Sequence, residues 1–341
     1  MPLLDDRGGH EPEFPSPGLT RRTREFWLQS SVTSPGGSPV VSDGVQVGIA
    51  TRKLPSRAAN LRTRGLLSTC ANPRCASGWL HLWRSRSGPI FEGGWSCSAA
   101  CTAARIESAV RRELEGRSLG GAPVVSQHRH RIPLGLVMLE QGWVTSEQLR
   151  KAVEAQRAAG EGRLGDWLIG GQGVSETLVT RALSLQWNCP VLNLDRHDPS
   201  MMAVVLPRLF VEAFAALPLR VAAGSILYCG FEDRVDPVLT LAAQRMCGLR
   251  VEAGVVCGSL FREAHERLLN SNFPSAELIS TVSDAPLVRA LTRAVERVRP
   301  VESKLIRLHD CLWLRMWRRP QNSALPESSG VEDVIVSLAA D

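Results

Sequence analysis

Four cysteines in two close pairs are the residues of this sequence best suited to bind a metal ion. Cys70 and Cys75 are separated by four residues, Cys97 and Cys101 by three, and 21 residues lie between the pairs. Two pairs on two turns supply the four thiolates of a tetrahedral zinc site without a large hydrophobic core. Four thiolate ligands leave no coordination position for a reacting water, so the pattern predicts a structural zinc site. The alternative is four separate thiols that share no ligand.

The second cysteine pair falls where a helix is predicted to begin, in the sequence CTAARIESAVRREL. Apolar residues recur there near helical spacing, and free backbone N–H groups at a helix start stabilise thiolate charge. The segment resembles treble-clef zinc fingers, in which a knuckle with one Cys pair is followed by a hairpin and then by a CS-x-x-C helix start, here CSAAC. Four aromatic residues would form the apolar shell of the site: Trp79, Trp83, Phe91 and Trp95.

An internal repeat occupies the middle of the chain. Residues 133–156, PLGLVMLEQGWVTSEQLRKAVEAQ, are followed after six residues by a second copy of 24 residues, RLGDWLIGGQGVSETLVTRALSLQ, at 163–186. Each copy is typical of a short helix, a Gly-containing break, a Thr or Ser N-cap (Thr145, Ser175) and a second helix, and Gln148 stands at the capping-box position after Thr145. The repeat therefore predicts a helical subdomain over residues 131–190.

The duplicated pattern consists of [R/P]LG, apolar pairs, a Gly near position ten, a Leu or Val near position 17 and a closing Gln. It resembles the MshEN domain, the N-terminal module of the ATPases of type II secretion and type IV pilus assembly (GspE and PilB type). The resemblance covers about residues 131 to 270. It includes a following α/β unit, in which ALPLRVAA, the pair Asp236–Pro237 and CGLRVEAGVV stand in the family's order.

The resemblance implies a binding site for cyclic di-GMP, in which each motif takes one half of the ligand. An Arg fork pairs well with guanine O6 and N7, and helix N-termini receive phosphates. Carried over by position, the contacts are Leu134, Gly135, Leu149 and Gln156 in the first motif, and Arg163, Leu164, Gly165, Leu168 and Gln186 in the second.

Two positions depart from the family pattern. Pro133 stands where the first motif has Arg, and Arg131 is the nearby arginine that would have to replace it. Gln172 stands at an expected Gly, with Gly173 one position later. Loss of one charged bidentate contact costs about 1–3 kcal/mol, or about ten- to a hundredfold in affinity. The alternative to nucleotide binding is a pair of helical hairpins whose Leu and Gly residues only pack.

The sequence lacks the phosphate loop that the parent ATPases need. Gly-Lys-Ser and Gly-Lys-Thr do not occur, and none of the three lysines follows a glycine. G-x-S-x-G and H-E-x-x-H are missing too. We therefore expect no enzymatic activity.

The last predicted helix covers residues 301–318 and has a basic amphipathic pattern. It would dock on a partner or an anionic membrane face, or pack on its own α/β unit with the arginines outward. Its residues are Leu305, Leu308, Leu312 and Trp313 on the apolar side, and Arg307, Arg315, Arg318 and Arg319 on the basic side.

Length and composition set the broad organisation. The 341 residues are 44% hydrophobic and 22% charged, which allows two domains plus tails and excludes a collagen-like or wholly disordered chain. The expected class is α+β. The predicted parts are a disordered N-terminus (1–65), a four-cysteine zinc module (66–118), the tandem helical repeat (131–190), a small α/β subdomain (191–272), C-terminal helices (280–320) and a loose tail (321–341).

Charge and hydropathy bear on location and partners. The formal charge of +6 arises in the first 130 residues, which hold 17 basic and 10 acidic residues. No secretory signal or transmembrane segment is predicted, so we expect a cytoplasmic protein. One hypothesis is a bacterial regulator or adaptor that binds cyclic di-GMP or contacts secretion or pilus assembly proteins. The alternative is a zinc-containing nucleic-acid-binding or protein-interaction scaffold with a degenerate nucleotide site.

Overall fold

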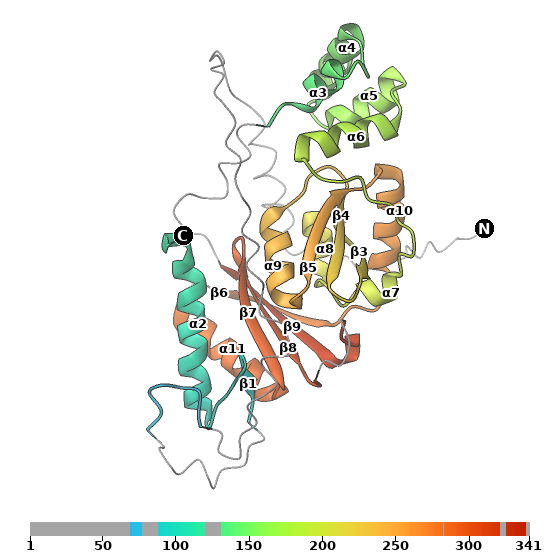
Figure 1. Ribbon diagram of the computed structural model, residues 1–341. Helices are drawn as coiled ribbons and strands as arrows, with labels where there is room; N and C mark the ends of the chain where they lie inside the picture. The colour runs from blue at the N-terminus through green and yellow to red at the C-terminus, as the bar shows by residue number, and fades with distance from the viewer. Residues whose placement is uncertain (1–68, 77–87, 120–130, 282, 321–324, 339–341) are drawn as a thin grey trace, which may run out of the picture. The chain divides into compact units, whose positions relative to one another are not determined.

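The computed structural model describes residues 69–76, 88–119, 131–281, 283–320 and 325–338 (Figure 1). Helices and strands are both abundant in these ranges, which confirms the predicted α+β class. The predicted disordered N-terminus and the aromatic residues Trp79 and Trp83 lie outside the described residues. Within the described ranges, no helix is both long and apolar enough to cross a membrane.

The repeat forms the predicted two pairs of helices, namely α3 (Leu134–Glu140), α4 (Ser146–Ala159), α5 (Leu164–Gln172) and α6 (Glu176–Trp187). The capping box at Thr145 is present, with Gln148 N–H donating to Thr145 Oγ1 over 3.2 Å. In the second copy the left-handed turn residue is Gly173, and α5 ends at Gln172. The turn has thus moved by one position, as the displaced glycine suggests. The core of this subdomain contains Val137, Met138, Val144, Ala152, Leu168, Val174, Val179 and Ala182.

The α/β unit combines four helices with three strands in the described residues 199–269. It comprises α7 (Pro199–Met202), α8 (Arg208–Phe214), β3 (Ala216–Ala222), β4 (Ile226–Phe231), α9 (Pro237–Cys247), β5 (Arg250–Val255) and α10 (Gly258–Leu269). Strand β4 is central, antiparallel to β3 and parallel to β5. Asp236 caps α9 by accepting the Leu239 N–H over 2.8 Å, and Gly248 ends the helix in the left-handed region.

The C-terminal part corrects the sequence prediction. Helix α11 (Asp284–Val298) is where it was expected, but residues 301–318 form two antiparallel strands, β7 (Glu302–Leu308) and β8 (Cys311–Trp317). The predicted loose tail contains a short 3-10 turn (Ser328–Gly330) and strand β9 (Val331–Leu338). With β6 (Ser275–Thr281) these strands form a sheet of order β6-β9-β8-β7, so the tail supplies a central strand.

This sheet is buried on both faces, which explains the wrong helix prediction. Leu312 and Leu314 of β8 face the core formed with α11 and α2 (Ala99–Leu119), whereas Trp313 and Trp317 face the α/β unit. Helices α2 and α11 lie beside each other on the first face (Figure 1). A strand covered on both faces reads as a continuous apolar run, and periodicity alone does not distinguish such a run from a helix.

Arg315 is the clearest departure from the outward-facing arginines of the predicted helix. Its side chain is buried and makes two 2.8 Å bonds to the Asp333 carboxylate, which also accepts the Trp313 indole N–H. Its third nitrogen donates to the carbonyls of Val204 and Val205. The pair is fully hydrogen-bonded, and it ties the C-terminal sheet to the α/β unit.

The cysteine-bearing segment shares a core with the C-terminal sheet. It comprises β1 (Ile90–Phe91), β2 (Gly94–Trp95) and α2, and Ile106 and Val110 of α2 are buried with residues of α11. The backbone of Ile90 and Glu92 donates to the carbonyls of Pro300 and Ser303 at the start of β7. Segments far apart in the sequence therefore form one packed unit, and the predicted zinc module has no separate core among the described residues.

Candidate functional site

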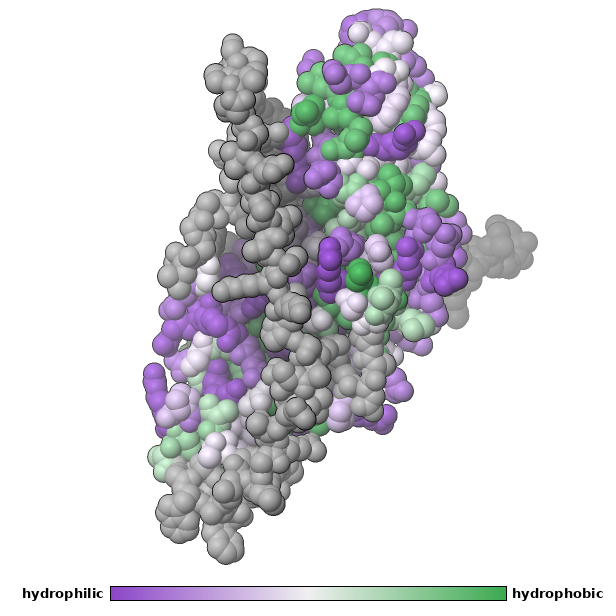
Figure 2. Space-filling model, viewed as in Figure 1, coloured by the Kyte–Doolittle hydropathy of each residue, from purple (hydrophilic) through white to green (hydrophobic). Residues whose placement is uncertain are grey.

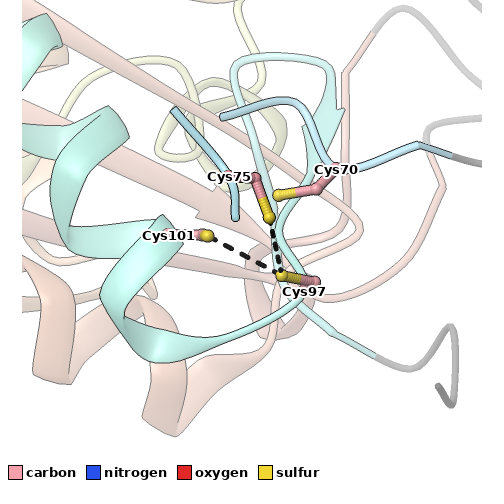
Figure 3. A group of neighbouring side chains, drawn as sticks. All are labelled: Cys70, Cys75, Cys97 and Cys101. Carbon is pink, nitrogen blue, oxygen red and sulfur yellow. Dashed lines mark hydrogen bonds between the residues drawn. The ribbon is translucent and has the colours of Figure 1, made fainter. Parts of the chain in front are cut away.

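The structure brings the four predicted metal ligands together. Cys70 and Cys75 come from the loop before the β1–β2 hairpin, Cys97 follows β2, and Cys101 lies in the first turn of α2. Their sulfurs turn toward one another (Figure 3) and all lie within 4.8 Å of each other. The spacing in the sequence therefore predicted a real spatial cluster.

The distances fit a zinc ion better than a disulfide. Cys97 Sγ lies 3.5 Å from Cys75 Sγ and 3.7 Å from Cys101 Sγ. Zn–S bonds of about 2.3 Å in a tetrahedron place the sulfurs about 3.8 Å apart, whereas a disulfide requires about 2.05 Å. Burial and the neighbouring thiols raise the pKa of Cys97 to about 12. A divalent cation bound by the four sulfurs would favour their thiolate form.

Local contacts position the first pair against the hairpin and the helix. The Ala71 N–H donates to the Trp95 carbonyl over 2.9 Å, and Arg105 of α2 donates to the Gly94 carbonyl. A Cβ on Gly94 would lie 2.5 Å from the Ala71 Cβ, so only glycine allows this approach. Ser98 Oγ accepts the Cys101 N–H over 3.3 Å and fixes the helix start.

Three arginines of α2 with described side chains, Arg105, Arg111 and Arg112, are engaged within the segment, which weakens the nucleic-acid alternative. Arg111 pairs with Glu107 at 3.0 Å, and Arg112 pairs with Glu92 at 2.6 Å. Arg105 is bonded to a backbone carbonyl, as above. Phosphate binding by these side chains would have to displace existing acceptors.

The two repeat motifs meet through their LG pairs in a reciprocal manner. A Cβ on Gly135 would lie 2.6 Å from Leu149 of its own motif and 3.2 Å from Leu164 of the other. A Cβ on Gly165 would lie 3.0 Å from Val179, the equivalent of Leu149, and 3.9 Å from Leu134 of the first motif. Each glycine thus allows its helix to approach both motifs, and the arrangement has approximate two-fold symmetry.

The closing glutamines repeat the same symmetry. Gln156 of the first motif donates from Nε2 to the Gly162 carbonyl over 2.9 Å, immediately before the second motif. Gln186 of the second motif donates to the Ile132 carbonyl over 2.8 Å, two residues before the Leu134–Gly135 pair. Each glutamine therefore bonds, through its Nε2, the backbone immediately before the other motif. An amide oxygen is a further hydrogen-bond acceptor of each side chain.

The remaining predicted contacts differ in accessibility. Leu134, Leu149 and Leu164 are half-buried beside the glycine contacts, whereas Leu168 is fully buried in the helical core. The structure thus gives Leu168 a packing position. Apolar surface remains among the repeat helices (Figure 2), where Ile132, Leu136 and Leu185 are more than half exposed.

The arginines at the two motif entries have different surroundings. Arg163 forms ion pairs with Glu232 and Asp233, which follow β4. The guanidinium of Arg131, the proposed replacement for the missing first-motif arginine, instead stacks on Trp187, 3.3 Å from the ring centroid. Glu232 and Asp233 were not predicted as partners of Arg163, because the sequence of a loop does not indicate which distant side chains it contacts.

Comparisons with known proteins relate part of the chain to a pilus ATPase. No known protein family model matches the chain. Over 157 residues the chain is 29% identical to the type IV pilus assembly ATPase PilB of Myxococcus xanthus (strain DK1622). This similarity covers 44% of the chain and 27% of PilB, so the chain spans about a quarter of the length of that relative.

Part of the chain is also similar to two solved structures. A structure of MshE with cdg (cyclic di-GMP) is 27% identical, has a TM-score of 0.34, and is covered over 99% of its length by 40% of this chain. A structure of the N-terminal domain of XpsE is 22% identical with a TM-score of 0.30, and 39% of this chain covers 92% of it.

Proposed function

We propose that the tandem motif binds cyclic di-GMP and that the chain is a non-enzymatic regulator or adaptor of a type II secretion or type IV pilus system. In this proposal residues 131–272 correspond to the N-terminal domain of the GspE and PilB type. The observation that carries it is the reciprocal geometry of Gly135, Gly165, Gln156 and Gln186. A ligand made of two identical halves suits a site made of two equivalent motifs.

The side chains at the motif entries have the chemistry to recognise guanine. The Arg163 guanidinium would donate to O6 and N7, which is the bidentate pattern that favours guanine over other bases. The amide oxygens of Gln156 and Gln186 would accept from guanine N1–H or the N2 amino group. Half-buried Leu134 and Leu164 would supply apolar contact. With Pro133 in the first motif, we expect that half to contribute less than the half around Arg163.

The sequence supports a non-enzymatic role. The chain has no Gly-Lys-Ser or Gly-Lys-Thr, which the phosphate loop of the parent ATPases requires. We propose a cytoplasmic adaptor that passes a nucleotide signal to secretion or pilus proteins. The four-cysteine cluster would hold one structural zinc ion between the loop of Cys70 and Cys75 and helix α2.

Calorimetry with the full-length chain and cyclic di-GMP tests the proposal. We expect saturable heat, and an Arg163→Ala variant should bind about ten- to a hundredfold more weakly. Arg208→Ala is the matched control, because Arg208 is a surface arginine in an ion pair with Glu212 at 2.7 Å. Absence of heat from a folded wild-type chain would remove the ligand, and ATP hydrolysis by the purified chain would remove the non-enzymatic role.

A further inference from the structure

We propose that Glu232 and Asp233 form a latch that holds Arg163 and that cyclic di-GMP must open to bind. The inference rests on the proposed function, and it adds a device that couples the ligand site to the α/β unit. Both carboxylates lie in the loop between β4 and α9, outside the tandem motif. The same arginine would therefore serve two alternative partners, one inside the chain and one in the ligand.

The latch is built from direct contacts. Arg163 stands as N-cap residue of α5, and its Nη1 lies 2.8 Å from Glu232 Oε2. Its Nε lies 3.3 Å from Asp233 Oδ2. The arginine side chain is 50% exposed, while that of Glu232 is 17% exposed. The carboxylate is therefore the fixed partner, and the arginine is the one that can swing toward a ligand.

A second contact ties the same motif to the same edge of the α/β unit. Glu176, the first residue of α6, accepts the Ser259 N–H over 2.6 Å and its hydroxyl over 2.7 Å, at the start of α10. Arg262 of α10 lies 3.6 Å from Glu232 and 3.9 Å from Glu176. Because Arg262 remains beside Glu232, that carboxylate keeps a cationic neighbour when Arg163 leaves. Opening the latch therefore does not strand an isolated buried charge.

Competition between the two partners sets the effect on affinity. Partly exposed ion pairs contribute about 0.2–1 kcal/mol each, which corresponds to about 1.4- to fivefold per pair. Two such pairs would weaken ligand binding by about two- to thirtyfold without abolishing it. By linkage, a ligand that takes Arg163 weakens the connection between the repeat and the α/β unit by the same factor. Ligand binding would then change how firmly the repeat is held to the α/β unit, which a partner protein bound to both parts would sense.

A double variant, Glu232→Gln with Asp233→Asn, tests the latch in the full-length chain. We expect it to bind cyclic di-GMP about two- to thirtyfold more tightly than wild type at low salt. The ratio should approach one near 1 M salt, where the Debye length is about 3 Å. Asp166→Asn is the matched control: Asp166 lies in the first turn of α5, acts on Arg163 through its charge, and is not its ion-pair partner.

The outcomes separate the latch from the proposed function. Tighter binding by the double variant with a smaller change for Asp166→Asn supports the latch, and so does binding by the double variant alone. If wild type binds cyclic di-GMP and the double variant binds no more tightly, or only as much more tightly as Asp166→Asn does, the latch is wrong while the proposed ligand is supported. If neither the folded wild type nor any folded variant binds cyclic di-GMP, both the proposed ligand and the latch are wrong.

Discussion

Removing the proposed zinc ion from the four-cysteine cluster is expected to release the loop of Cys70 and Cys75 while helix α2 stays in place. Among the described residues outside the cluster, the Ala71 N–H bonds this loop to the Trp95 carbonyl of the hairpin. Helix α2 and its hairpin have their own anchors in the shared core. The side chains of Phe91, Ile106 and Val110 are at most 2% exposed. Full burial of such side chains contributes about 1.5–3 kcal/mol each, or roughly 5–9 kcal/mol together.

Hydrogen exchange on the full-length chain, with and without a zinc chelator, measures this difference. The amides of Ala71 and Cys75 should lose protection on chelation, whereas those of Ile106 to Val110 should keep most of it. Elemental analysis should give about one zinc per chain, which Cys97→Ser should abolish and the control Cys189→Ser should retain. Loss of protection along the whole of α2 would refute the energetic reasoning, and full zinc content in Cys97→Ser would refute the ligand assignment.

Three further predictions concern the scaffold. Asp333→Ala leaves the buried charge of Arg315 without its partner and should lower the free energy of unfolding by about 3–5 kcal/mol in urea titrations. Burial alone would raise the pKa of Glu113, but hydrogen bonds from a neighbouring arginine and a backbone N–H outweigh it and lower that pKa. Stability from this group is therefore present above its unfolded pKa of about 4.3 and lost as pH falls further, so Glu113→Gln should flatten the acid limb of a pH–stability curve. Gly135→Ala crowds a leucine whereas Gly170→Ala meets nothing within 4 Å, so thermal unfolding should find the first variant less stable by about 1–3 kcal/mol.

The sequence predicted best where local rules decide the structure. The capping box of Thr145 and the cysteine spacing each depend on residues a few positions apart or on a fixed ligand geometry. The repeat revealed its own symmetry, since equivalent residues 30 positions apart occupy equivalent contacts. Gly135 and Gly165 follow this rule at the motif crossing.

The sequence failed where distant segments decide the structure. Residues 301–318 have apolar residues at spacings that fit a helix, but they form strands because one face of the sheet is covered by α2 and α11 and the other by the α/β unit. Arg315 looks like a surface arginine until Asp333, in the predicted tail, is placed beside it. The partners of Arg163 were missed for the same reason, because Glu232 is 69 residues away.

Binding of cyclic di-GMP by the tandem motif is measured by an equilibrium titration of the full-length chain. We predict saturable binding of one cyclic di-GMP per chain, because two motifs form one two-fold site, with GMP binding far more weakly since it fills only one half. Absence of binding at about 1 mM cyclic di-GMP would contradict this prediction, provided that circular dichroism shows the helices intact. A dissociation constant of about 1 mM corresponds to about 4 kcal/mol of binding free energy. Two independent sites with equal affinity for GMP would contradict the prediction as well.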